Sequence, residues 1–184
     1  MQFTKMPPIL QALVAILVVM AGIWDWRTRR IPNWLTFSSV ILGIGLNALM
    51  YQTSGVWLSL KGLGLALLIY FPLFLLRGMG AGDVKLMAAL GAIVGWQNWL
   101  GILIVTAIFG GIAALVVVIV NGRLRKTLEN IWFIGLSIRK REAPYAGNPQ
   151  LDVRTDQGVR LPHGVVIAFG TVAFLAATSV LGYS

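Results

Sequence analysis

The chain has 184 residues, of which 58% are hydrophobic and only 11% are charged, too little polar surface for a water-soluble domain. This composition predicts an all-α, multi-pass membrane protein, and the length allows one domain over residues 1–184. The chain contains no cysteine, which excludes disulfides, a thiolate nucleophile and cysteine-ligated metals. The single histidine, His163, argues against a histidine-based metal site, so we expect neither a metal nor a cofactor.

Six apolar runs follow one another along the chain, and a helix needs about 20 apolar residues to cross a bilayer. We therefore predict a bundle of six membrane-spanning helices. The first run has only Lys5 ahead of it and no small-residue cleavage site before Asp25, so we interpret it as a retained span. The predicted spans cover residues 9–24, 35–50, 58–76, 84–96, 99–120 and 164–181.

The basic residues indicate how the bundle is oriented. All of the 15 Lys and Arg residues except Lys5 and Lys61 lie beside or within the loops after spans one, three and five. Positively charged loops stay in the cytoplasm, so we expect an inner-membrane protein with both termini outside. If residues 84–96 did not cross, the most basic loop would lie outside, and the charge bias therefore supports this short fourth span.

The net charge of +9 raises nucleic-acid binding as an alternative, but the positive-inside rule and anionic lipid headgroups account for the basic residues. Residues 123–141 predict an amphipathic helix on the cytoplasmic surface, between spans five and six. Its apolar face comprises Leu124, Leu128, Ile131, Trp132 and Ile138. Residues 142–162 are polar and rich in turn residues, which predicts a loop.

Two of the six acidic residues lie in unusual places. Asp25 and Asp83 each lie at the cytoplasmic end of an apolar span, where a carboxylate is costly and usually functional. The predicted topology places both in the same leaflet. Water solvates the other four in the long cytoplasmic segment: Glu129, Glu142, Asp152 and Asp156.

A pair of facing carboxylates has a defined chemistry. Two such groups cannot both ionise easily, so the pair shares one proton. One member then takes a proton from water while the other protonates a carbonyl oxygen, as in aspartic proteases. Because Asp83 starts a span, near the positive end of a helix dipole, we hypothesise that it is the base and that Asp25 carries the proton.

Three motifs carry a resemblance to a known family. "DWRTRRIPN" (residues 25–33) and "GAGDVKL" (residues 80–86) resemble the two aspartate motifs of the type IV prepilin peptidases, membrane aspartic proteases of the GxGD type. "LPHGVVIAFG" (residues 161–170) is similar to the last-span motif of that family, although Val165 replaces a frequent proline. The chain lacks the cysteine-bearing insertion of larger members, so it resembles the short form associated with Tad/Flp pili, and methyl transfer is not implied.

The resemblance implies a function. Asp25 and Asp83 would be the catalytic dyad of an endopeptidase that removes the short basic leader of prepilins and pseudopilins. The cut would follow a glycine on the cytoplasmic side of the membrane. Membrane lipids and the pilus assembly machinery are further expected partners, and nucleic acid is not.

Five more motif residues are expected to shape the site. We expect Gly80 and Gly82 to allow positive φ and a close approach of the backbone. Pro32 is expected to begin the second helix, and Asn33 to hydrogen-bond the backbone there. Lys85 lies two positions after Asp83, so we expect it to face away from that residue, toward lipid phosphate or the substrate.

Other readings remain open at this stage. The two aspartates could carry protons in a small proton-coupled transporter, or the chain could be a non-catalytic scaffold for pilus assembly. Asp83 could serve only as a helix N-cap, and Asp25 could pair with Arg29. His163 is expected to be a polar residue at the membrane boundary.

Overall fold

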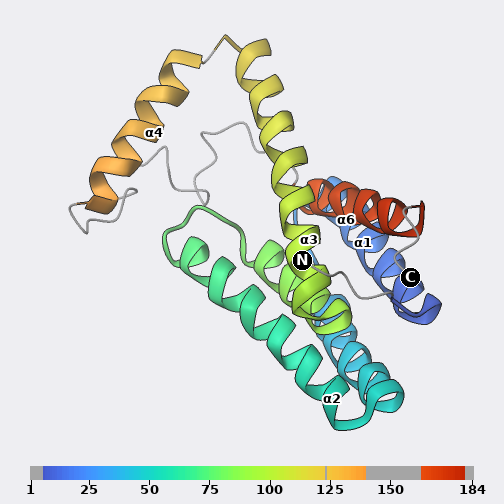
Figure 1. The fold of residues 1–184 in the computed structure, drawn as a ribbon. Helices are drawn as coiled ribbons and strands as arrows, with labels where there is room; N and C mark the ends of the chain where they lie inside the picture. The colour runs from blue at the N-terminus through green and yellow to red at the C-terminus, as the bar shows by residue number, and fades with distance from the viewer. Residues whose placement is uncertain (1–5, 123, 140–162, 181–184) are drawn as a thin grey trace.

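The computed structural model describes residues 6–122, 124–139 and 163–180, and these residues form helices and no strand (Figure 1). The predicted all-α class is confirmed. Four of the described helices, α1, α2, α3 and α6, are long and apolar enough to cross a membrane. The helices are α1 (Pro8–Thr28), α2 (Asn33–Leu75), α3 (Ala81–Val120), α4 (Leu124–Arg139) and α6 (His163–Val180).

The α2 helix folds back on itself. Its backbone leaves the helical conformation at Gln52, where φ is 55° and ψ is −136°. Nδ2 of Asn47 donates a hydrogen bond of 3.0 Å to Oγ of Ser59, twelve residues later. A straight helix would separate these residues by about 18 Å, so α2 forms a hairpin with two arms (Figure 1).

The α3 helix has the same form. At Gly95, φ is 74° and ψ is 170°, a conformation that is open essentially only to glycine. Nε1 of Trp99 donates a hydrogen bond of 2.9 Å to the backbone oxygen of Met87, on the other side of this turn. Thus α3 also has two arms. The six runs expected from the sequence correspond to α1, the two arms of α2, the two arms of α3, and α6, and a tight turn at Gln52 or Gly95 separates the arms of each pair.

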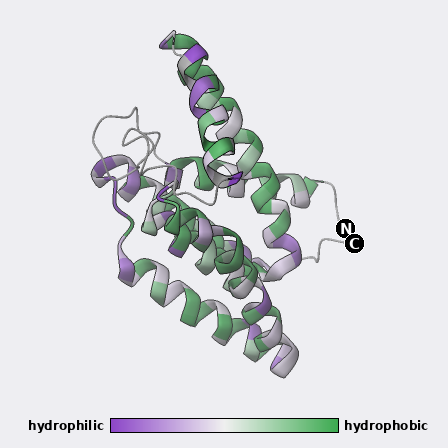
Figure 2. Cartoon of the chain, turned by 90° about the vertical axis from the view of Figure 1, so that its left-hand side faces the viewer, coloured by the Kyte–Doolittle hydropathy of each residue, from purple (hydrophilic) through white to green (hydrophobic). Residues whose placement is uncertain are grey.

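The first arm of α3 forms the centre of the bundle. Its residues from Leu86 to Val94 are all buried, because α2 and α6 pack against α3 and α1 also contacts it. This position explains why the stretch from Leu86 to Val94 is apolar on every side. The outer surfaces of the surrounding helices also carry many apolar side chains, as expected where lipid is the solvent (Figure 2).

The two hairpins are held together by close backbone contact and by buried hydrogen bonds. A Cβ atom on Gly62 or on Gly91 would overlap the backbone of the other residue, so only glycine allows this approach. The fully buried Asn47 also donates to the backbone oxygens of Ala92 and Ile93, at 3.3 Å and 3.0 Å. These contacts connect the turn region of α2 to α3.

The α4 helix stands apart from the bundle (Figure 1). The helix predicted for residues 123–141 is observed over Leu124–Arg139. Its exposed apolar side chains are Leu124, Leu128, Ile131 and Trp132, while the side chain of Ile138 is not among those described.

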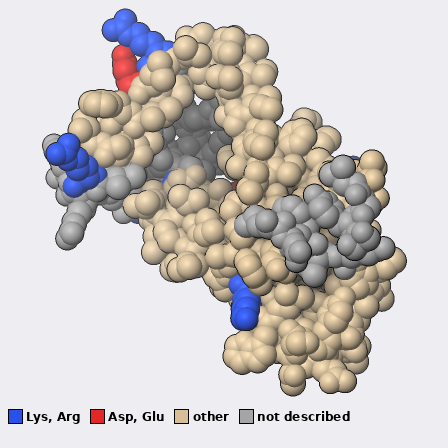
Figure 3. Space-filling view, viewed as in Figure 1, with Lys and Arg blue, Asp and Glu red and all other residues tan. Residues whose placement is uncertain are grey.

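Charged side chains are sparse on the face of the molecule shown in Figure 3, where most of the surface is tan. The predicted loop at residues 142–162 lies outside the described residues.

Candidate active site

Asp25 lies in the last turn of α1. The helix ends at Thr28, and Arg29 follows in the left-handed conformation with φ of 54°. The backbone N–H of Arg29 donates to the backbone oxygen of Asp25 at 2.9 Å. Asp25 is only 8% exposed, so the last turn of α1 carries an acidic residue that is buried inside the bundle.

Asp83 lies in the first turn of α3 and is half-buried. The N-cap is Gly80, not Asp83 as one alternative supposed. The carboxylate of Asp83 instead turns back and accepts a hydrogen bond from the backbone of Gly80, as the third residue of a capping box does. A Cβ on Gly80 would lie 3.3 Å from Oδ2 of Asp83, so the absence of a side chain leaves room for this contact.

The fold brings the two acidic residues together. Asp83 interacts electrostatically with both Asp25 and His163, although α1, α3 and α6 are far apart in sequence. His163 is the first residue of α6 and is exposed. The site therefore combines the end of α1 with the beginnings of α3 and α6.

Gly164 is in close contact with Asp25. Its backbone N–H donates a hydrogen bond of 2.9 Å to Oδ2 of Asp25. A Cβ on Gly164 would lie 2.9 Å from Cβ and 3.0 Å from Oδ2 of Asp25, so no larger residue fits without a shift. The N-terminus of α6 thus points its positive end at the Asp25 carboxylate. The sequence analysis assigned Gly164 no role, although the last-span motif contains it.

The start of α2 joins the same end of the bundle. Pro32 is the N-cap, with φ of −62° and ψ of 137°, so Asn33 begins the helix instead of Pro32. Nζ of Lys85 donates a hydrogen bond of 2.9 Å to Oδ1 of Asn33. These two predicted site residues therefore contact one another and link α2 to α3.

The expectation that Gly80 and Gly82 adopt a positive φ is wrong. Gly80 has φ of −74°, and Gly82 lies within helix α3. The described glycines with positive φ are Gly95 and Gly122. Gly82 instead provides space, because a Cβ there would lie 3.4 Å from Cβ of Ile31.

The left-handed turn ahead of the second motif is made by Arg77, with φ of 56°. The N–H of Arg77 donates to the oxygen of Phe74, and the N–H of Gly78 donates to the oxygen of Leu73. This pair of bonds is a Schellman motif that closes α2. It leaves only a short connection before α3 begins, which fixes the start of α3 near the end of α2.

Tyr70 is a neighbour of the site that the sequence analysis missed. It is buried in the second arm of α2 and interacts electrostatically with Asp83. Its ring packs edge-on against Trp99, with the ring centroids 6.0 Å apart. No signal in the apolar run around Tyr70 distinguishes it from a lipid-facing tyrosine. Among the described residues, no group of three or more His, Asp or Glu could hold a metal ion.

The site is thus a pair of neighbouring carboxylates in a helical membrane bundle. The model of the type IV leader peptidase family matches residues 12–115, which is more than half of the chain and includes Asp25 and Asp83. The chain therefore belongs to this family. His163 and Gly164 lie beyond the matched region.

Curated proteins are similar to the chain in sequence. The prepilin leader peptidase/N-methyltransferase of Escherichia coli (strain K12) is 34% identical over 106 residues, covering 54% of this chain and 47% of the relative. The protein of the same name from Legionella pneumophila is 36% identical over 131 residues, covering 65% of this chain and 44% of the relative. The chain thus spans about half the length of the curated relatives it matches. No solved structure matches it.

Proposed function

We propose that this chain is an aspartic endopeptidase that removes the short basic leader of prepilins and pseudopilins, cutting after a glycine. The observation that carries the proposal is that Asp25, at the end of α1, and Asp83, at the start of α3, lie close enough to interact electrostatically. Membership of the leader peptidase family and the printed names of the relatives support the reaction class.

The chemistry follows from a carboxylate pair that holds one proton. The ionised carboxylate takes a proton from water as the water oxygen attacks the scissile carbonyl carbon. The protonated partner donates its proton to the carbonyl oxygen. When the tetrahedral intermediate collapses, the C–N bond breaks and a proton passes to the leaving amine.

The earlier assignment of Asp83 as the base rested on its place at a helix start. Since the N-terminus of α6 also points at Asp25, both carboxylates face the positive end of a helix. The helix dipoles therefore do not decide which of the two is the base, and we assign the shared proton to the pair.

The proposed orientation uses six crossings of the inner membrane. The hairpins of α2 and α3 each supply two antiparallel crossings, and α1 and α6 supply one each. The end of α1 and the starts of α2, α3 and α6 then lie on one side, which the basic residues assign to the cytoplasm. Both termini lie outside, and α4 lies along the cytoplasmic surface with its apolar face in the lipid.

The chain fits the short Tad/Flp-type form in our proposal. It has no cysteine anywhere, and α1 leads into α2 through a connection of a few residues, which leaves no room for the insertion of the larger members. We therefore assign peptidase activity to it and no methyl transfer. The assembly machinery of the pilus is the expected recipient of the trimmed subunits.

Co-expression with a prepilin tests this function. Wild-type chain is expected to shorten the prepilin by its leader, visible on a gel, whereas Asp25→Asn and Asp83→Asn are expected to leave it whole. The matched control is Glu129→Gln, which removes an exposed acid paired with Arg125 on α4 and is expected to cleave normally. Cleavage that persists in either aspartate variant, or is absent from the wild type, would contradict the proposal and favour the transporter or scaffold readings.

A further inference from the structure

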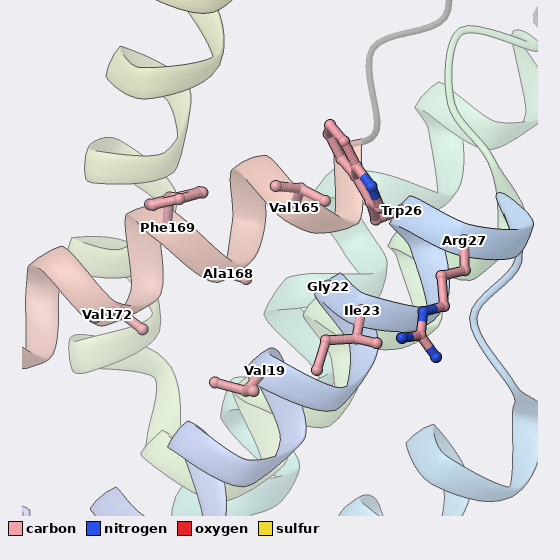
Figure 4. Close-up of a pocket in the computed structure, with 9 residues that line it drawn as sticks. All are labelled: Val19, Gly22, Ile23, Trp26, Arg27, Val165, Ala168, Phe169 and Val172. Carbon is pink, nitrogen blue, oxygen red and sulfur yellow. The ribbon is translucent and has the colours of Figure 1, made fainter.

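A groove of about 540 Å³ runs between α1 and α6, beside the candidate active site (Figure 4). Its wall on α1 includes Val19 and Ile23, and its wall on α6 includes Phe169 and Val172. The lining positions are spaced by three and four residues on both helices, so each helix offers one continuous face. The groove is therefore a regular channel along two helices and not an irregular gap.

The floor of the groove consists of small residues. A Cβ on Gly22 would lie 3.3 Å from Cβ of Ala168, so α1 and α6 are in close contact there. Val19, Ile23 and Phe169 stand on either side and are 50%, 47% and 66% exposed. No described part of the chain covers these walls, so the groove opens to the surroundings of the bundle.

One end of the groove is formed by residues that directly follow Asp25 and Gly164 in the chain. Trp26 and Arg27 line this end, directly after Asp25, and Val165 lines it directly after Gly164 (Figure 4). Tryptophan and arginine are typical of the interface between lipid and water. From this end the α1 wall extends about 12 Å toward the middle of the span, since Val19 and Arg27 are eight positions apart on the helix.

We propose that this groove holds one face of the apolar helix of a prepilin-type substrate, with the start of that helix at Asp25 and Gly164. The inference rests on the proposed function, which requires a peptide bond next to an apolar helix to reach the carboxylates. At its inner end the groove is lined by Trp26 and Val165, which directly follow the hydrogen-bonded Asp25 and Gly164, and from there it leads into the lipid. Small residues on its floor allow the close helix packing that membrane interfaces use.

A second groove is less suited to this role. It has a volume of about 340 Å³ and lies between α2 and α3, where Asn33, Phe37 and Lys85 line it. Lys85 is two positions from Asp83, so its side chain leaves α3 on a different face. Among the described residues, the lining of this second groove includes none from α1 or α6, the helices that carry Asp25 and Gly164.

Single-cysteine crosslinking tests the location, because the chain has no cysteine of its own. Ile23→Cys or Phe169→Cys is introduced into the inactive Asp83→Asn protein, which is co-expressed in membranes with a prepilin carrying one cysteine a helical turn after the cut. The control is Ile112→Cys on α3, whose native side chain is also exposed, at 57%. After mild oxidation, we expect a disulfide to the prepilin from both groove positions and not from the control. Equal crosslinking at Ile112→Cys, crosslinking only between two copies of the chain, or none at all would overturn the proposal.

A groove-filling substitution supplies a kinetic test. Val172→Trp fills the groove from an exposed wall position, away from the close contact of α1 with α6. In the active protein it is expected to raise KM about tenfold with kcat little changed, because substrate binding weakens equally in the ground state and the transition state. The control is Val116→Trp, on an exposed face of α3, which is expected to leave both constants unchanged. Equal kinetics for the two variants would overturn the proposal that the groove binds the substrate helix, while leaving the peptidase proposal intact. A wild-type protein that does not cleave would instead refute the function.

Discussion

At the scale of single residues, the contact between Asp25 and Gly164 is the most informative feature of the site. Asp25 is buried, and its Oδ2 receives the backbone N–H of Gly164 at 2.9 Å. The hydrogen bond orients the carboxylate, and the missing side chain of Gly164 allows α6 to come this close. Gly164 therefore matters because it has no side chain and because its N–H donates a hydrogen bond. Its backbone is helical, so a special backbone conformation is not the reason for glycine here.

Gly164→Ala tests this contact. The added methyl group would displace the Asp25 carboxyl, and a shift of about 1 Å at a catalytic group can cost on the order of 10²-fold in rate. We expect that loss in kcat/KM together with an altered pH profile of cleavage. The control is Gly170→Ala, whose Cβ would overlap Thr106 on α3 without approaching the acidic residues. It is expected to lower thermal stability with an unchanged pH profile; the same profile for both variants would contradict the positioning role.

At the scale of secondary-structure elements, the two helical hairpins determine where the acidic residues lie. The turn at Gly95 reverses α3 after a short buried arm, so the helix that begins beside Asp83 does not continue straight out of the bundle. Asn47 ties the α2 hairpin to this arm through two backbone oxygens. The starts of α2 and α3 are joined in turn by the hydrogen bond between Lys85 and Asn33.

Gly95→Ala should strain the α3 hairpin. With φ of 74° and a would-be Cβ only 2.7 Å from side-chain atoms of Leu58, alanine is expected to lower the free energy of unfolding by about 1–3 kcal/mol. Thermal unfolding of the purified protein in detergent measures this. Gly111→Ala is the matched control, because open space surrounds it within α3, and it is expected to be neutral or slightly stabilising. Equal stability of the two variants would contradict the hairpin geometry.

Asn47→Ala is expected to loosen the two hairpins. Removing its buried amide leaves the backbone oxygens of Ala92 and Ile93 short of a donor, at a cost of about 1–3 kcal/mol. Asn121→Ala is the control, because its exposed side chain donates a hydrogen bond to the oxygen of Val117, within its own helix end. The same unfolding measurement applies, and a loss in Asn121→Ala as large as that in Asn47→Ala would be inconsistent with the account.

At the scale of the whole molecule, much of the fold follows from the sequence. The apolar runs predicted the helices to within a few residues, because a membrane helix needs a nearly uninterrupted apolar stretch. The tight turns at Gln52 and Gly95 were not predictable, since they depend on contacts between residues far apart in the chain, such as that of Gly95 with Leu58. Helices α1, α3 and α6 meet at one end, as the charge distribution suggested.

The site was predictable only in part. Asp25 and Asp83 stood out because carboxylates at the ends of apolar runs are rare. Gly164 did not stand out, because its contact is with Asp25, 139 residues earlier in the chain. Tyr70 did not stand out, because its interaction is with Asp83 on the neighbouring hairpin. The torsional role expected of Gly80 and Gly82 was wrong because the sharp turn lies earlier, at Arg77.

The central claim is that Asp25 and Asp83 act as one catalytic unit. The most direct test is the cleavage rate of a purified prepilin in lipid vesicles by the wild type, Asp25→Asn, Asp83→Asn and the double variant. Because residues that act together are strongly non-additive, we expect each single variant to lose about 10³-fold or more and the double variant to lose no more than either. Cleavage within about tenfold of wild type in either single variant, or losses that multiply in the double variant, would contradict the account.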